Sequence, residues 1–228
     1  MGLDMNPMGK PKPDHEDEFL DLFLKLNGRA PSEGRGLFGK LLGKKDDHEA
    51  MTARFQDIMI APWEAIGAPV VGTDPEADDW VRKVFREGRM PSMASEDEAL
   101  EKMTGYRALQ VMEVCDGFPI YTHAYDYDGV DRTSFRGAFL TLCEGVLSED
   151  IINAAWTNML ADELADWGRT VGAEAASFAE ANRVYHVIGQ RDAEFDEDSP
   201  ASKAHIADSA ARWAAFWSSR GHGSEAFF

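Results

Sequence analysis

The stretch of the sequence with the most chemically versatile side chains runs from residue 121 to residue 132 and reads YTHAYDYDGVDR. Its imidazole, carboxylate, phenol and guanidinium groups could transfer protons, bind a cation or recognise a partner. Alternate residues of a β-strand share a face. An extended conformation would therefore place one histidine and three tyrosines together: Tyr121, His123, Tyr125 and Tyr127.

One interpretation of this stretch is acid–base catalysis. His123 would carry the proton, a neighbouring carboxylate would orient its ring, and Arg132 would steady an anionic substrate. Asp126 and Glu113 are the other catalytic candidates. No spacing in the chain requires this arrangement, because no HExxH, GxSxG or Rossmann pattern is present. These residues are therefore weak catalytic candidates, and a non-enzymatic role is favoured.

A second interpretation is a site for calcium or magnesium, which prefer oxygen ligands. Three aspartates could supply them: Asp126, Asp128 and Asp131. An EF-hand loop needs glycine at position six and glutamate at position twelve. Counting from Asp126 puts Gly129 at position four, and counting from residue 124 puts Phe135 at position twelve. We therefore assign no metal ligand and expect no cofactor.

A third interpretation is a binding surface, in which tyrosines supply rigid contact area and arginines recognise charge. The residues predicted to form it are Tyr121, Tyr125, Tyr127, Arg132 and Arg136. An ordinary aromatic strand followed by an aspartate-rich turn and a helix cap would also explain the pattern without any ligand. Among the functional interpretations, binding is favoured over catalysis.

A glycine-rich basic segment covers residues 28–45, with five glycines, five basic residues and one acid. Within it, GRGLFGKL nearly matches the phosphate-loop pattern GxxxxGK[ST], but Leu41 replaces the hydroxyl residue and no apolar strand precedes Gly34. The same segment could form a short basic amphipathic helix, whose three lysines would attract an anionic membrane only weakly. A surface loop is the favoured interpretation.

Apolar residues at helical spacing predict several helices. They cover approximately residues 14–26, 51–59, 74–85, 95–103, 135–146, 152–167, 173–189 and 200–217. Asp74-Pro75 and Ser95 with Glu98 are typical helix starts, and Asn27-Gly28 is a typical helix end. Residues 2–9 are extended in character.

The clearest strand signal is a hairpin over residues 106–127, where two apolar stretches flank the turn Asp116-Gly117. The sequence thus predicts an α+β fold that is predominantly helical, with a small antiparallel sheet around this central hairpin. A mainly α protein with a peripheral hairpin is the alternative. We expect a single domain over residues 1–228, with residues 1–47 as a possible N-terminal arm.

The composition of the chain limits the partners and the compartment that can be expected. The chain of 228 residues has 41 acids against 23 lysines and arginines, a net charge of −18, which argues against a nucleic-acid partner. No secretory signal or membrane-spanning stretch is apparent in the sequence. The two cysteines, Cys115 and Cys143, are typical of free thiols in a reducing compartment. We therefore expect a cytoplasmic protein without stable membrane association.

The resulting hypothesis is an acidic cytoplasmic binding or regulatory protein that engages a protein partner, possibly a basic one, through an acidic and aromatic surface. The alternative is a small metal-assisted or acid–base enzyme centred on residues 113–136. The oligomeric state and the partner's identity stay open.

Overall fold

The computed structural model describes residues 3–30, 44–112, 120–122 and 133–227, without the side chains of residues 44–47. Contacts divide the chain into two compact units, one made of Met1–Met8 with Pro62–Phe228 and the other of Gly9–Ala61. Each unit is described separately. The single-domain expectation stays a prediction.

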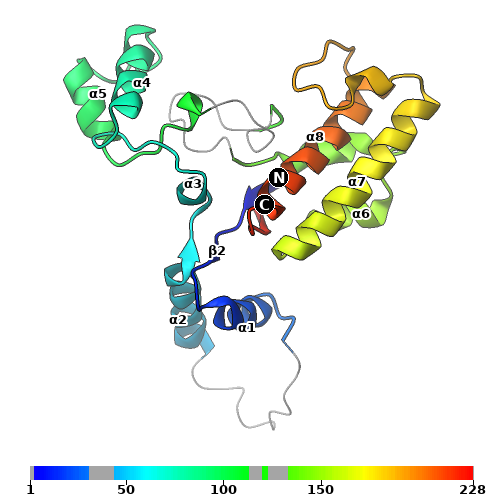
Figure 1. The fold of residues 1–228 in the computed structure, drawn as a ribbon, viewed down its shortest axis with the longest axis horizontal. Coiled ribbons are helices and arrows are strands. Elements are labelled where there is room, and N and C mark those ends of the chain that lie inside the picture. The colour runs from blue at the N-terminus through cyan, green and yellow to red at the C-terminus, as the bar shows by residue number, and fades with distance from the viewer. Residues whose placement is uncertain (1–2, 31–43, 113–119, 123–132, 228) are drawn as a thin grey trace. The chain divides into compact units, whose positions relative to one another are not determined.

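The smaller unit contains two helices and a short strand pair (Figure 1). Its elements are β2 (Lys10–Pro11), α1 (Glu16–Leu26), α2 (Lys44–Asp57) and β3 (Met59–Ile60), with β2 and β3 antiparallel. Phe19 of α1 stacks on Phe55 of α2 with ring centroids 4.8 Å apart. Arg54 of α2 binds both carboxylate oxygens of Glu18, at 2.7 and 2.8 Å. One aromatic pair and one bidentate ion pair thus join the two helices.

This ion pair makes the smaller unit sensitive to acid. Hydrogen bonds from Arg54, and then from His15, lower the pKa of Glu18 from 4.5 to about 2. Because the folded pKa is depressed, the stabilisation is present above pH 4.5 and is lost as the pH falls toward 2. We expect α1 and α2 to lose hydrogen-exchange protection, corrected for intrinsic rates, across this window.

Glu18→Gln should lower the protection at neutral pH and flatten this pH dependence. Glu16→Gln, in the same first turn but without an ion pair to any residue that the structure describes, is the matched control and should behave like the unmodified chain. Equal pH profiles for the Glu18→Gln variant and the unmodified chain would contradict the assigned role of this pair.

The larger unit is mostly helical (Figure 1). Its α-helices are α3 (Pro62–Ala65), α4 (Pro75–Arg86), α5 (Glu96–Met103), α6 (Glu149–Ala154), α7 (Ala161–Ala181) and α8 (Pro200–Ser218). Its 3₁₀ helices are η1 (Leu109–Val111), η2 (Gly137–Cys143) and η3 (Tyr185–Val187), and its strands are β1 (Asp4–Pro7) and β4 (Ser224–Phe227).

The strands β1 and β4 come from opposite ends of the described chain and pair antiparallel, with Asp4 opposite Phe227 and Pro7 opposite Ser224. A bridge from Met5 to Phe135 borders β1 on its other side, and a bridge from Met159 to Ser224 borders β4. Strand β1 is therefore bordered on both sides by other segments of the larger unit.

The fold class is confirmed: the protein is α+β and predominantly helical, with small antiparallel sheets. The described strands, however, do not come from the predicted hairpin. Leu109–Val111, predicted as strand, form the 3₁₀ helix η1, because Leu109 is buried in a small cluster with Ala68. The predicted turn at Asp116-Gly117 lies outside the described residues.

Several predicted helix boundaries are confirmed and others shift. Ser95 accepts a hydrogen bond from the Glu98 amide at 3.1 Å, as the predicted cap requires, and α4 begins at Pro75. The helix predicted over 173–189 is wrong beyond Ala181, where α7 ends and Arg183 adopts a positive φ of 61°. The helix predicted over 135–146 is the 3₁₀ helix η2.

The helices α7 and α8 lie side by side and form the main core (Figure 1). Small residues permit the close approach: a Cβ atom at Gly168 would lie 2.8 Å from the Cβ of Ala214, whereas one at Gly172 would lie 3.3 Å from the Cβ of Ala211. Buried Trp213 and Trp217 lie on the same helix, α8. The close packing of α7 on α8 thus helps to fix the positions of these two tryptophan side chains.

This geometry predicts that Gly168→Ala destabilises the protein. Overpacking costs about 1–3 kcal/mol, which exceeds the roughly 0.5–1 kcal/mol that alanine gains over glycine in a helix. Gly172→Ala is the matched control, since its contact is longer and its neighbour has only to yield slightly. In urea unfolding, a Gly168→Ala variant at least as stable as Gly172→Ala would contradict the close-packing argument.

Candidate functional site

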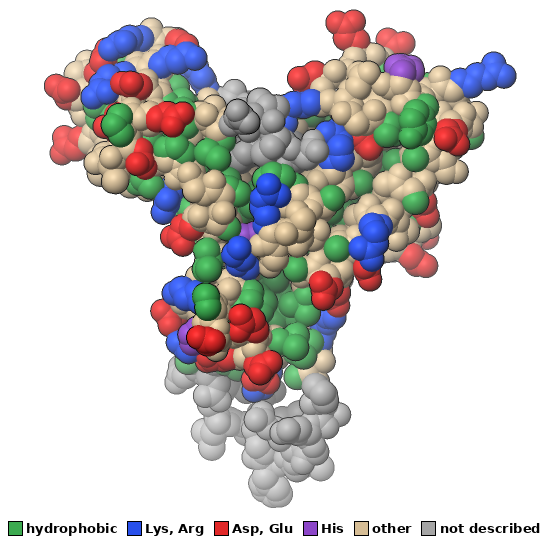
Figure 2. Space-filling model, in the orientation of Figure 1, with side chains coloured by type: hydrophobic (Ala, Val, Ile, Leu, Met, Phe, Trp, Pro, Cys, Tyr) green, Lys and Arg blue, Asp and Glu red, His purple; other side chains and the backbone are tan. Residues whose placement is uncertain are grey.

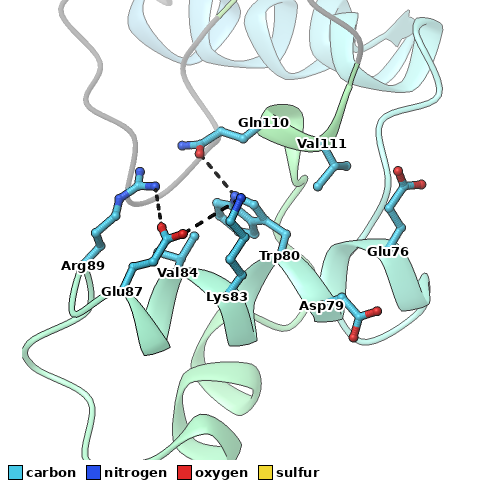
Figure 3. A pocket seen from close by; sticks show the side chains of 9 residues that line it. All are labelled: Glu76, Asp79, Trp80, Lys83, Val84, Glu87, Arg89, Gln110 and Val111. Atoms are coloured by element: carbon cyan, nitrogen blue, oxygen red, sulfur yellow. Dashed lines mark hydrogen bonds and ion pairs between the residues drawn. The ribbon is translucent and has the colours of Figure 1, made fainter.

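An open pocket of about 340 Å³ lies along α4 (Figure 3). One of its walls consists of residues of α4 and the residue that follows it: Glu76, Asp79, Trp80, Lys83, Val84 and Glu87. Gln110 and Val111 of η1 line it as well, together with Arg89. The pocket thus lies between a helix and a 3₁₀ helix that pack on one small apolar cluster.

The helical repeat explains why these side chains share a wall. Residues spaced three or four apart lie on one face of a helix, so Glu76, Trp80, Lys83 and Glu87 follow one another along successive turns. Trp80 is only 6% exposed, and its Nε1 donates a hydrogen bond to the side-chain oxygen of Gln110 at 3.3 Å. This bond joins the two walls of the pocket (Figure 3).

Charge is unevenly distributed along the pocket. At the C-terminal end of α4, Glu87 lies between Lys83 at 3.9 Å and Arg89 at 3.6 Å, so two cations share one carboxylate. At the N-terminal end, Asp79 pairs with Arg82 at 3.0 Å, and exposed Glu76 has no ion pair with any described residue. Among the described residues, the lining carboxylate without an ion pair is therefore that of Glu76.

The described residues also contain a cluster of titratable side chains inside the core. His205 Nε2 lies 2.9 Å from the carbonyl oxygen of Gln190, which can only accept, so this nitrogen carries the proton. His205 Nδ1 then accepts from the hydroxyl of Tyr121 at 2.8 Å. The thiol of Cys143 is buried against the backbone of α8, 3.5 Å from the Lys203 carbonyl oxygen.

Burial sets the protonation of all three groups. Desolvation lowers the pKa of His205, raises the pKa of Tyr121 and raises the pKa of Cys143 to about 12. Each shift favours the neutral form of its group, and the imidazole, phenol and thiol are all neutral at neutral pH. This cluster is suited to holding the core together, since it has neither a ready proton donor nor a thiolate nucleophile.

Two of the five predicted binding residues lie in the described part of the chain. Tyr121 is half-buried, packs 5.0 Å from the ring of Phe139, and uses its hydroxyl for His205. Arg136 lies 3.7 Å from the largely buried carboxylate of Asp4, with 36% of its side chain exposed. The structure brings these two residues together only through the backbone, where the Arg136 amide donates to the Tyr121 carbonyl at 2.7 Å.

The other predicted residues lie outside the described residues. They are the binding candidates Tyr125, Tyr127 and Arg132, the catalytic candidates Glu113, His123 and Asp126, and the metal candidates Asp126, Asp128 and Asp131. The same holds for Cys115 and for residues 34–41 of the glycine-rich segment. Their roles stay predictions.

The described ranges contain neither a cluster of metal ligands nor a helix that could cross a membrane. Residues 3–30, 44–112, 120–122 and 133–227 contain no group of three or more His, Cys, Asp or Glu side chains placed to hold a metal ion. Within the same ranges, no helix has both the length and the apolar character needed to cross a bilayer.

Comparison with known proteins identifies no relative: no family model, no curated protein and no solved structure matches this chain.

Sequence reasoning missed the pocket on α4. The helix predicted over residues 74–85 is confirmed as α4, but the sequence did not single out the charged residues that flank buried Trp80 on one side of it. The available signal was Glu76, Trp80, Lys83 and Glu87 in one helical row. Nothing in the sequence indicated that η1, predicted as strand, would supply a second wall.

The Tyr121–His205 bond predicts a stability effect. Tyr121→Phe removes the hydroxyl and leaves His205 Nδ1 without its donor in the core, which should cost about 1–3 kcal/mol of unfolding free energy. Tyr185→Phe, which removes an exposed hydroxyl that bonds to no described residue, is the control and should change stability by less than about 0.5 kcal/mol. Equal urea midpoints for the two variants would show that the bond contributes nothing.

Proposed function

We propose that this protein is a non-catalytic cytoplasmic binding protein that engages a basic protein partner through the surface of residues 144–228. This part of the chain has fifteen acidic residues and six lysines or arginines. It thus contributes nine of the chain's 18 net negative charges. Acidic side chains are visible over this part of the molecule in Figure 2 (upper right).

The observation that carries the proposal is a set of exposed carboxylates without an ion pair among the described residues. Its members are Glu149, Asp150, Asp162, Glu180, Asp192, Glu194, Asp196, Glu197 and Asp198. Their field is directed into solvent, where it would accelerate encounter with a basic surface.

Helix stability explains only some of these acids. Glu149, Asp150 and Asp162 lie in first turns, where a negative charge interacts favourably with the helix dipole. Glu180 lies in the last turn of α7, where the same interaction is unfavourable and no basic residue compensates it. The helix dipole therefore does not account for an acid at this position.

An exposed aromatic side chain gives this acidic surface an anchor. Tyr185 in η3 is 51% exposed and follows Glu180 closely in sequence. Tyrosine is enriched among the residues that contribute most to binding energy in protein interfaces. Tyr185 therefore supplies the aromatic component that the sequence analysis assigned to residues 121–127.

The test is affinity capture with the full chain as bait, identification of the captured protein, and measurement of its association rate at several salt concentrations. A basic partner is expected, with an association rate that falls as salt rises. Replacing Asp192, Glu194, Asp196 and Glu197 by their amides should make association slower than that of the unmodified chain at the same salt concentration.

Tyr185→Ala should raise Kd about tenfold through faster dissociation, equivalent to about 1.4 kcal/mol. Tyr106→Ala is the matched control, since Tyr106 is 45% exposed but lies outside residues 144–228. A neutral or acidic partner that binds independently of salt, or equal effects of the two tyrosine variants, would contradict the proposal.

A further inference from the structure

The loop of residues 189–198, between η3 and α8, lies against α8 and is bonded to it at Gln190 (Figure 1). The carbonyl oxygen of Gln190 accepts two hydrogen bonds, from His205 Nε2 at 2.9 Å and from Arg212 Nη2 at 2.8 Å. Both donors belong to α8. One is a permanent cation, and the other is an imidazole that becomes a cation when it binds a second proton.

We propose that protonation of His205 releases the loop of residues 189–198 from α8. The loop is docked at neutral pH, when the imidazole is neutral, and opens in mild acid. The release is a property of the chain alone and does not depend on the proposed function. Its consequence for a basic partner rests on that function, because the loop carries part of the acidic surface.

The charges next to the imidazole oppose a second proton. Arg212 is bonded to the same carbonyl oxygen as His205, and Asp208 balances this cation with a bond to Arg212 Nε at 2.9 Å. The side chains of Arg212 and Asp208 are only 21% and 10% exposed, so solvent screens them little. An imidazolium at His205 adds a buried positive charge that this pair leaves uncompensated.

Aromatic rings lie next to the imidazole on its other sides. Tyr121 donates its hydroxyl to His205 Nδ1 at 2.8 Å, and the ring of Phe195 in the loop lies 5.1 Å from the imidazole between centroids. In the protonated ring both nitrogens are donors, so Nδ1 no longer accepts from Tyr121. The neutral thiol of Cys143, which interacts with Tyr121, supplies no counter-charge.

The direction of the pH dependence follows from these contacts. Burial lowers the pKa of His205 from its ordinary value of 6.5, and the charge of Arg212 lowers this pKa further. The backbone of Gln190 and Arg191 and the charge of Asp208 oppose the shift without reversing it. Because the docked state has the lower pKa, the open state binds the proton more readily. Docking is therefore fully stabilised above pH 6.5 and weakens as the pH falls below 6.5.

The loop is the part of this environment that can open without disturbing the main core. Its residues alternate between two sides, with Ala193 and Phe195 partly buried against the small cluster around Val187. The exposed side carries a row of acids: Asp192, Glu194 and Asp196. None of residues 190–198 belongs to the main core. Segments with few buried contacts open first, and opening admits water to the imidazolium.

The experiment is hydrogen exchange of the full chain between about pH 7.5 and about pH 5, above the range in which carboxyl groups ordinarily titrate. The Gly189 amide is the reporter, because its bond of 2.9 Å to the Asp208 carboxylate requires the docked loop. Its protection, corrected for intrinsic rates, should fall by up to about tenfold per pH unit below pH 6.5, because opening takes up one proton. The Val184 amide, bonded to the Ala179 carbonyl at the end of α7, should keep its protection.

Two variants assign the effect to His205. His205→Gln retains a donor for the Gln190 carbonyl oxygen but binds no proton, so the protection of Gly189 should become independent of pH in this window. His186→Gln removes an exposed histidine of η3 and is the matched control. It should show the same pH dependence as the unmodified chain. The unmodified chain tests the release even where His205→Gln does not fold.

Protection of Gly189 that stays constant across the window would overturn the proposal. So would a parallel loss at Val184, which would mean that the fold opens as a whole, or an unchanged pH profile in folded His205→Gln. All these measurements use the chain without a partner. Failure to capture a basic protein would therefore contradict the proposed function alone, whereas a Gly189 amide that does not respond to pH would contradict the loop release alone.

Discussion

The contact between α7 and α8 is the interaction on which the rest of the larger unit depends. Gly168 allows the backbones to approach, and α8 is buried along most of its length as a result. Because α8 is buried, the segments around it can bond to its side chains. Trp213 donates to the Thr133 carbonyl at 2.6 Å, next to the residues that bridge to β1, and His205 bonds both Tyr121 and the Gln190 carbonyl.

The same constraint explains which parts of the fold could be predicted from the sequence. The starts of α4, α5 and α8 depend on local chemistry, such as Pro75 in a first turn or the Ser95 cap, and these are confirmed. The pairing of β1 with β4 joins residues more than two hundred positions apart and leaves no local signal. The 3₁₀ helix η1 depends on the burial of Leu109, which overrides strand propensity.

The candidate sites likewise combine features that the local sequence predicts with features that depend on tertiary structure. Tyr121 was predicted from its neighbours in sequence to face outward with other tyrosines, yet its hydroxyl bonds to a helix that lies 84 residues further along the chain. Its environment could not be predicted, because strand alternation assigns a face without saying what covers it. The pocket on α4 was missed for a related reason: one wall is readable as a helical row, and the other is supplied by tertiary structure.

Burial distinguishes the titratable groups in the interior of this protein from those on its surface. Burial keeps Tyr121, Cys143 and His205 neutral, which a packed core tolerates better than charge. The carboxylates of Glu76 and Asp79 on α4, and most of those in residues 144–228, are instead exposed to solvent. In the described part of the chain, the three titratable groups of this core cluster are thus neutral, whereas most acidic side chains face solvent. This distribution is the physical basis on which we propose recognition, rather than catalysis, for these residues.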